Sequence, residues 1–417
     1  MNVRKSSIQL HPDPSRALLR SFGFPEPRTS RIISRVLSLP EAEAARLSQE
    51  VCASFEPRHR NFVQYVLQRY EEAAAPLTLS VEEITRERKI LIGSYFACEY
   101  TIEAAALFNP SIVWHPDQSG VGEGAKRFIL SLRSTGEGHL SSISFRTGQI
   151  SAEGIVEFDA SRQFAETGVC RLGEPGSAPL YTLDFDPAAP LSERVLFPIH
   201  ASESRGMEDA RFVEFRDDSS VKYIATYTAY DGRTISPQLI ETCDFTHFTI
   251  TQFAGVEVEH KGFALFPRKI GGKYVMLSRQ DNENNFIMFS DSLYQWDTKE
   301  LIMEPKEPWE IVLIGNCGSP IETDRGWLVI HHGVGPMRTY TISAFLLDLE
   351  DPRRLIGRLA EPIVFTDKED RNGYVPNAVY SCGSIIHNGR LILPYASADT
   401  VTRFATVDVN QLLDEMV

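Results

Sequence analysis

The stretch that decides the fold is Gly206-Met207-Glu208-Asp209-Ala210-Arg211, which runs directly into Phe212-Val213-Glu214-Phe215. The second run has the period-two pattern of a half-buried strand. Lys222 to Tyr227 predicts a second strand, and Tyr230-Asp231-Gly232 is typical of the turn that ends it. Two acids and an arginine are therefore expected at the start of a strand, where a rigid scaffold can hold them.

Similar segments recur along the chain in pairs. Strands that run into small or polar residues are expected at 126–133, 222–227, 273–279, 326–332 and 389–395. Each follows a segment of a second kind, at 109–113, 208–212, 261–266, 318–321 and 376–379. From the second pair on, the step is roughly 50 to 65 residues, and the longer first step must hold an insertion. This recurrence predicts an all-β fold, a five-bladed β-propeller at 91–417, with a large sandwich or barrel as the alternative.

A propeller would bring polar residues of distant segments to one central channel, because its blades are arranged radially. Asn109, Asp209, Lys261 and Asn377 occupy matching places in the segments of the second kind. The matching residues of the strands that follow are Arg133, Tyr227, Arg279, His331 or His332, and Tyr395. Such a pocket would combine acids for proton transfer, cations for an anion and aromatic faces for a sugar.

The charge, the apolar stretches and the cysteines of the sequence exclude several classes of protein. The formal charge of −14 argues against a nucleic-acid partner, and we find neither a stretch long and apolar enough to span a membrane nor a signal peptide. We therefore expect a soluble cytoplasmic protein without a membrane partner. Its six scattered cysteines indicate neither a zinc site nor a disulfide framework, so no metal is expected.

Residues 1–90 have a different character and are expected to form a helical N-terminal extension packed outside the propeller. Pro40 and the acids after it predict the start of a helix, and 58–72 carries an apolar stripe. Ser80-Val81-Glu82-Glu83 has the pattern of a capping box that opens a third helix. The segment could also pack against a second subunit, so a homo-oligomer is possible.

Four motifs in this order resemble glycoside hydrolase family 130, the five-bladed β-mannoside phosphorylases and β-1,2-mannosidases. The resemblance covers about residues 95 to 410 and excludes the N-terminal helices. The motifs are Gly206 to Arg211, Tyr227 to Gly232, Ala264 to Ile270 and His331-His332-Gly333-Val334.

The resemblance implies a mechanism and residue roles. Asp209 would be the general acid of an inverting reaction, acting through a hydroxyl of the sugar, and no cofactor or metal is required. Inorganic phosphate would be the nucleophile that cleaves a mannose-containing oligosaccharide to mannose 1-phosphate. Basic residues would hold the phosphate: Arg133, Lys261, Arg279 and His332. We assign substrate binding to Asn109, Ser111, Arg211, Tyr227, Tyr230, Asp231 and Asn377.

The sequence also departs from the family pattern. The segment from Val312 to Pro320 has no basic residue where phosphorylases place a lysine, and Lys261 stands where an arginine is frequent. Glu257 and Glu259 could activate water instead. Three hypotheses therefore remain, namely a phosphorylase, an inverting β-1,2-mannosidase and a sugar-binding propeller without catalysis.

Strand geometry adds two expectations. Neighbouring residues of a strand face opposite sides, so only one of His331 and His332 should face the channel, which argues against a metal pair. By the same rule, Glu208 should point away from Asp209. No nucleophile elbow of a Ser or Cys enzyme is present.

Overall fold

The computed structural model describes residues 1–75, 84–160, 163–174, 176, 178–217 and 220–416. The chain divides into two compact units. The first, here called the β unit, comprises Met1–Pro12, Ala104–Ser161 and Thr167–Val417. The second, the helical unit, comprises Asp13–Glu103 and Arg162–Glu166. This division differs from the expected boundary near residue 90, because the first residues of the chain pair with its last strands.

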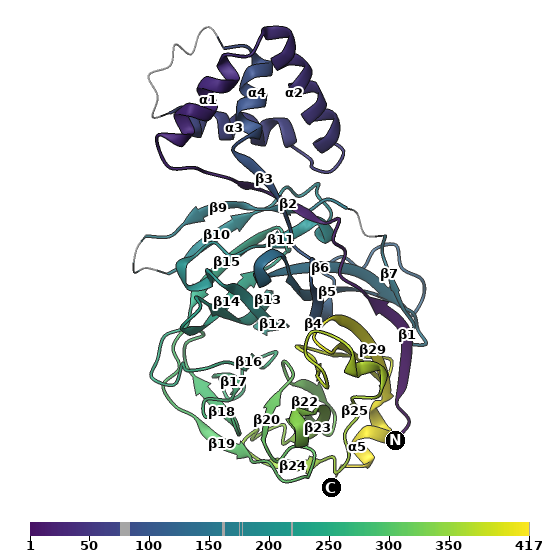
Figure 1. Ribbon diagram of the computed structural model, residues 1–417. Helices are drawn as coiled ribbons and strands as arrows, with labels where there is room; N and C mark the ends of the chain where they lie inside the picture. The colour runs from purple at the N-terminus through teal and green to yellow at the C-terminus, as the bar shows by residue number, and fades with distance from the viewer. Residues whose placement is uncertain (76–83, 161–162, 175, 177, 218–219, 417) are drawn as a thin grey trace. The chain divides into compact units, whose positions relative to one another are not determined.

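The described residues of the helical unit form four α-helices and one strand pair. The helices are α1 (Arg28–Leu37), α2 (Glu41–Phe55), α3 (Phe62–Ala74) and α4 (Arg86–Ser94), and β2 (Ala17–Ser21) pairs antiparallel with β3 (Ala97–Thr101) (Figure 1). Pro40 immediately precedes α2, as predicted. The predicted capping box at Ser80 lies outside the described residues. Helix α4 is capped by Thr85, whose side chain accepts a hydrogen bond from the Arg88 amide.

The β unit contains five antiparallel groups of strands, which we number one to five. Group one is β4 (Ala106–Trp114), β5 (Lys126–Thr135), β6 (Ser141–Ile150) and β7 (Val156–Phe158). Group two is β12 (Gly206–Asp217), β13 (Ser220–Tyr230), β14 (Ile235–Thr242) and β15 (His247–Gln252). Groups one and two belong to one 12-stranded sheet, in which β6 and β12 pair in parallel at Ser141 and Gly206. Group three is β16 (Ala264–Leu265), β17 (Tyr274–Ser278), β18 (Asn285–Ser290) and β19 (Glu300–Met303).

The last two groups have an inner strand in two pieces. Group four is β20 (Leu313–Asn316), β21 (Ile321–Thr323), β22 (Gly326–Val334), β23 (Tyr340–Leu347), β24 (Leu355–Arg358) and β25 (Val364–Phe365). Group five is β26 (Val379–Tyr380), β27 (Ile385–His387), β28 (Arg390–Ser397) and β29 (Val401–Asp408). Its outer edge is β1 (Arg4–Leu10), which pairs antiparallel with β29, and helix α5 (Val409–Asp414) follows β29.

The expected insertion lies between groups one and two. It holds β8 (Glu166–Thr167), β9 (Val169–Leu172), β10 (Tyr181–Asp184) and β11 (Arg194–Leu196). Strand β10 extends group two by pairing with β15, and β11 pairs with β6. Short 3-10 turns complete the fold: η2 (Glu137–His139), η3 (Leu191–Glu193), η4 (Ala201–Glu203), η5 (Pro336–Arg338) and η6 (Glu369–Arg371).

Each neighbouring pair of groups shares an apolar core. Groups one and two share a core that includes Ile129 and Phe212. Further cores join groups two and three, three and four, and four and five. The last core closes the series, because Ile392 and Phe404 of group five pack with Leu107 and Phe128 of group one. The fold is mostly β, and its five groups follow one another around a common centre (Figure 1).

Candidate active site

Three of the predicted residues share one unusual backbone conformation. Asn109, Asp209 and Asn377 have φ of 47°, 53° and 61°. Asn and Asp tolerate this left-handed region better than other residues that carry a side chain. At Asn109 and Asp209 the strand register also shifts, between Phe108 and Ser111 and between Glu208 and Arg211. Such bulges re-aim side chains and recur near active sites.

The bulges bring Asn109 and Asp209 together from groups one and two. Asn109 Nδ2 donates to Asp209 Oδ1 at 2.6 Å, and Arg133 Nη1 lies 3.4 Å from the same oxygen. Asp209 is 5% exposed. Burial raises the pKa of the Asp209 carboxyl, but the charges of Arg133, Lys261 and Arg211 outweigh it, so this pKa lies below its usual value. Asp209 is therefore an anion at neutral pH.

The expectation that Glu208 points away from Asp209 is wrong. Arg133 Nη2 donates to Glu208 Oε1 at 2.8 Å, so one guanidinium contacts both carboxylates. Side chains alternate only in a regular strand, and the left-handed residue at 209 interrupts the alternation. The carboxylates of Glu208 and Asp209 therefore both contact the Arg133 guanidinium.

A second cluster of site residues comes from groups two to five. Arg279 Nη1 lies 3.1 Å from His332 Nε2, and both side chains are buried. The ring of Tyr380 packs 4.8 Å from that of His332, and the Tyr380 hydroxyl accepts a hydrogen bond from Arg211 Nη2 at 2.7 Å. Burial and the nearby Arg279 charge hold the pKa of His332 well below its usual value, so the imidazole is neutral.

His331 faces the other side of β22, as the strand geometry predicts. Its ring packs against Trp309 and Phe345, whereas that of His332 packs against Tyr340 and Tyr380. Burial lowers the pKa of His331 to about 3. Within the described residues, no group of three or more His, Cys, Asp or Glu could hold a metal ion.

The side chains of three assigned substrate residues have local structural partners. Ser111 Oγ accepts from the Phe212 amide at 3.0 Å, and Asp231 Oδ1 accepts from the amides of Arg233 and Thr234 in a turn. Tyr227 is 2% exposed and donates to the buried Glu203, 2.5 Å away. The carbonyl of Asn377 accepts from the Tyr340 amide at 2.9 Å, which leaves its side chain free of that bond. Tyr230 ends β13 opposite Gly206.

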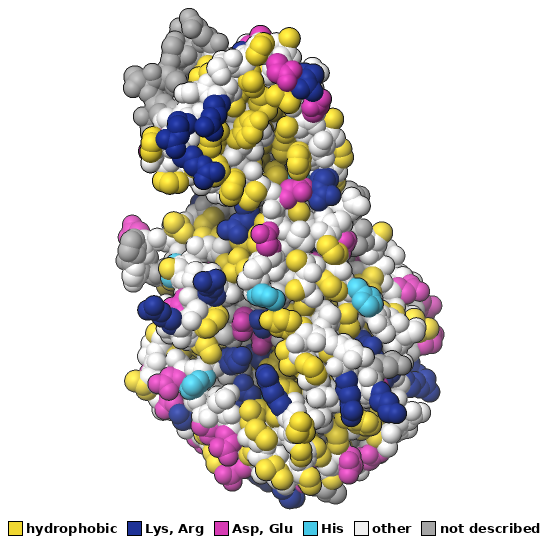
Figure 2. Space-filling view, viewed as in Figure 1, with side chains coloured by type: hydrophobic (Ala, Val, Ile, Leu, Met, Phe, Trp, Pro, Cys, Tyr) yellow, Lys and Arg dark blue, Asp and Glu magenta, His cyan; other side chains and the backbone are white. Residues whose placement is uncertain are grey.

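The structure adds Asp399 to the site. It lies in the turn between β28 and β29, and its carboxyl interacts with Asp209, Arg133, Arg338 and Lys261. Burial and the charge of Asp209 raise the pKa of Asp399 to about 6. The sequence held a signal for this residue, since the fifth recurring strand could have been extended past Tyr395 to its polar end, as for Arg133 and His332. Figure 2 shows acidic and basic side chains close together near the middle of one face of the β unit.

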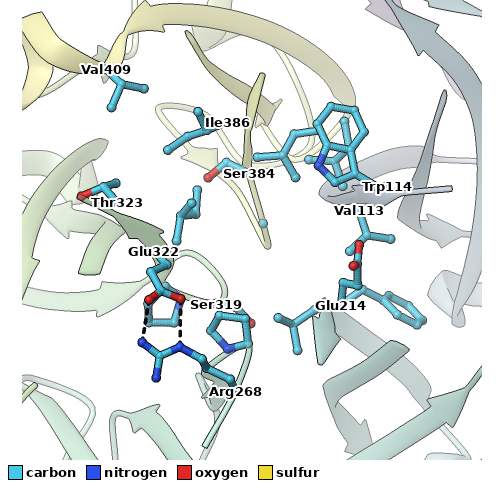
Figure 3. Close-up of a pocket in the computed structure, with 18 of the residues that line it drawn as sticks. Val113, Trp114, Glu214, Arg268, Ser319, Glu322, Thr323, Ser384, Ile386 and Val409 are labelled. Atoms are coloured by element: carbon cyan, nitrogen blue, oxygen red, sulfur yellow. Dashed lines mark hydrogen bonds and ion pairs between the residues drawn. The ribbon is translucent and has the colours of Figure 1, made fainter. Parts of the chain in front are cut away.

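A separate cavity of about 590 Å³ lies at the other end of the inner strands (Figure 3). Its lining includes Trp114, Glu214, Arg268, Glu322 and Ile386, and none of the residues assigned from the sequence. The charges around it pair among themselves: Arg268 binds Glu322 through two hydrogen bonds, and Arg216 binds Glu214.

Comparisons with known proteins identify relatives of this chain. A family model described as beta-1,4-mannooligosaccharide phosphorylase matches residues 189–417. A 1,2-beta-oligomannan phosphorylase of Thermoanaerobacter sp. (strain X514) is 35% identical over 214 residues, which are 50% of this chain and 71% of that protein. A beta-1,4-mannooligosaccharide phosphorylase of Ruminococcus albus is 34% identical over 185 residues, 42% of this chain and 55% of that protein.

A solved structure shows the same fold. The beta-1,2-mannobiose phosphorylase from Listeria innocua superposes with a TM-score of 0.56 at 19% identity, over 76% of this chain and 93% of that chain. None of the described helices is long and apolar enough to cross a membrane. The family match spans more than half of the chain and includes the Asp209 motif, so the protein belongs to glycoside hydrolase family 130, whose members are enzymes that act on mannosides.

Proposed function

We propose that the protein is an inverting phosphorylase of β-mannosides. Inorganic phosphate attacks C1 of the terminal mannosyl residue, the bond from C1 to the bridging oxygen breaks, and that oxygen takes a proton. The products are mannose 1-phosphate and the shortened sugar. Asp209 is the source of the proton, and as the family resemblance implies, the proton passes through a sugar hydroxyl. Phosphate is the co-substrate, and we propose no other cofactor.

The main support for this proposal is the burial of the Arg279 guanidinium and the set of partners around it. This guanidinium is 6% exposed, its described partner is the neutral His332, and its Nε has no hydrogen-bond partner. Among the described ion pairs, Arg279 has no carboxylate, whereas Arg133 has two. A buried, uncompensated cation is costly, and a bound anion would remove that cost. A phosphate held by Arg279, Lys261 and His332 meets this requirement.

Phosphate also accounts for the protonation that Asp209 needs. The charges of Arg133, Lys261 and Arg211 keep the Asp209 carboxyl ionised. A phosphate dianion beside Lys261 and Arg279 offsets those charges and raises the pKa of Asp209. We infer that Asp209 becomes an effective acid only when the co-substrate is bound, which couples the acid to the nucleophile.

The hydrolase is the second candidate, and its proposed bases are poorly placed. Glu257 Oε2 is paired with Lys299 Nζ at 2.6 Å, and Glu259 is exposed. A base that activates water must reach the anomeric carbon through one water molecule. Neither glutamate has a described contact with Asp209, Arg279 or His332.

For the scaffold we propose a five-bladed β-propeller, with each strand group as one blade. The closed series of five shared cores supports this reading. Strand β1 would complete the last blade from the N-terminus, so the β unit would be the catalytic domain and the helical unit a separate accessory domain.

The test is incubation with β-1,2- and β-1,4-mannobiose, with and without phosphate, since the names of the relatives include both linkages. We expect mannose 1-phosphate, detected by ³¹P NMR, with one of the two disaccharides and only when phosphate is present. Free mannose formed equally fast without phosphate would identify a hydrolase.

A further inference from the structure

An exposed aromatic pair lies on the β unit outside the residues considered so far. Tyr374 is 58% exposed, and its ring stacks on that of His139 with centroids 5.4 Å apart and an interplanar angle of 28°. His139 belongs to the turn between β5 and β6, and Tyr374 precedes β26. The pair therefore joins group one to group five.

Hydrogen bonds anchor Tyr374 next to the candidate active site. The Tyr374 amide donates to Thr400 Oγ1 at 2.9 Å, and the Val375 amide donates to the Ala398 carbonyl at 3.0 Å. Asp399 lies between these two anchors, and its carboxyl interacts with Asp209 and Arg133. The pair consequently lies at the rim of the same site, on the side of the proton donor.

The turns at this rim are strained. Ala398 and Asp399 have φ of 51° and 49°, and Met337 and Arg338, in the turn between β22 and β23, have φ of 57° and 56°. Each turn closes with an amide-to-carbonyl bond, from Thr400 to Ser397 and from Thr339 to Pro336. Tight hairpin turns with two positive φ values ordinarily use Asn and Gly. Residues held in this region are strained and gather at functional sites.

The direction of the reaction distinguishes the two sides of the site. Inversion requires phosphate to attack the face of C1 opposite the leaving oxygen. Arg279 and His332, from groups three and four, are the candidates for the phosphate side. Asp209 delivers its proton on the leaving side. We place Asp399 and Tyr374 on this side because Asp399 interacts more strongly with Asp209 than with Lys261.

Resting on the proposed function, we propose that Tyr374 and His139 form a platform for the leaving part of an oligomannoside chain. A pyranose ring presents an apolar face of C–H groups, and an exposed aromatic ring provides a matching flat surface with little conformational entropy to lose. The platform is a specificity-determining site that favours chains of three or more sugars over the disaccharide.

The experiment compares Tyr374→Ala and Tyr374→Phe with the parent enzyme on mannobiose and mannotriose of the cleaved linkage, at saturating phosphate. Tyr374→Ala should raise KM for mannotriose about tenfold, as expected for one lost stacking contact, and leave kcat and the KM for phosphate within about twofold. Tyr374→Phe retains the ring and should behave like the parent. Tyr294→Ala, at a tyrosine that is 41% exposed and bonded to Glu241, is the matched control and should change none of these values.

A binding measurement separates failure of this inference from failure of the proposed function. Calorimetry of mannotriose binding is carried out in the Asp209→Asn background, so it needs no turnover. Weaker binding with Tyr374→Ala supports the platform whether phosphate or water is the nucleophile. Unchanged affinity, or an equal loss for mannobiose and mannotriose, would overturn it.

Discussion

Charged side chains are paired differently at the two ends of the inner strands. At the Asp209 end, Arg279 is buried and has no carboxylate among the described ion pairs, and Asp209 is kept ionised by several cations. Five residues further along β12, Glu214 is paired with Arg216, and Arg268 is paired with Glu322 in the wall of the cavity of Figure 3. One scaffold thus holds both a site with a buried arginine that has no described carboxylate partner and a cavity whose charged side chains pair with one another.

This difference in pairing separates charged side chains with a structural role from those that we propose bind a ligand. A solvent-exposed ion pair contributes little to stability and nothing to recognition while its partners occupy each other. An unmatched buried cation is destabilising, so its presence indicates a missing anion. The presence of a large cavity is therefore a weaker guide to chemistry in this protein than the balance of charge.

The largest effect that would test this comparison is expected at Asp209. Asp209→Asn keeps the shape of the side chain and its left-handed backbone but removes the proton donor, so kcat should fall by about 10² or more. Steady-state kinetics measure the loss, and circular dichroism checks the fold. Glu214→Gln, at the cavity end of the same strand, is the matched control and should leave kcat unchanged.

Glu208→Gln sharpens the assignment of the acid. Glu208 shares Arg133 with Asp209, so this variant alters the position of Arg133 and should reduce activity by less than Asp209→Asn. Equal losses at both positions in folded protein would show that Asp209 is not the acid.

The next effect concerns two arginines that differ in their partners and in their burial. Arg279→Ala should raise the KM for phosphate about tenfold or more, because it removes a charge-assisted contact to the anion, and should leave mannoside binding largely intact. Arg268→Ala deletes the same charge beside Glu322 and should leave the KM for phosphate unchanged. If both variants respond alike, net charge rather than a specific anion site governs phosphate use.

The recurrence of segments in the sequence predicted much of the β unit, because each segment carries its own local pattern. Strands were expected in all five groups, and the insertion after the first was anticipated. The pairing of Arg4–Leu10 with β29 was not, since it joins the two ends of the chain and leaves no local trace.

Within the site, the repeats predicted which residues come close together better than they predicted side-chain directions. Asn109 contacts Asp209, and Arg279 contacts His332, whereas the roles of these residues stay predictions. The direction of the Glu208 side chain depends on a bulge that no local sequence pattern predicts. Asp399 was missed because an acid in a hairpin turn ordinarily faces solvent, whereas here two left-handed residues turn it toward Asp209.

The smallest effect is a pH-dependent gain in stability at Asp399. An unfolded aspartate titrates near pH 4, whereas burial and Asp209 raise the pKa of Asp399 to about 6. Between these values the folded chain binds more protons than the unfolded chain, so the free energy of unfolding falls as pH rises from 4 to 6. At pH 7 the ionised carboxyl costs up to about 2–3 kcal/mol, reduced by whatever solvent reaches it.

Asp399→Asn removes that cost. The variant should be more stable than the parent at pH 7, by about 1–3 kcal/mol, and nearly equal to it at pH 4, as measured by denaturant unfolding at both values. Asn also suits the left-handed backbone, but that contribution is the same at both pH values, so the difference between them isolates the carboxyl charge. Asp231→Asn is the control of opposite sign, because backbone amides of its turn lower the pKa of Asp231, and its loss should be greater at pH 7. An equal gain for Asp399→Asn at both pH values would show that Asp399 ionises normally and that Asp209 exerts no appreciable field on it.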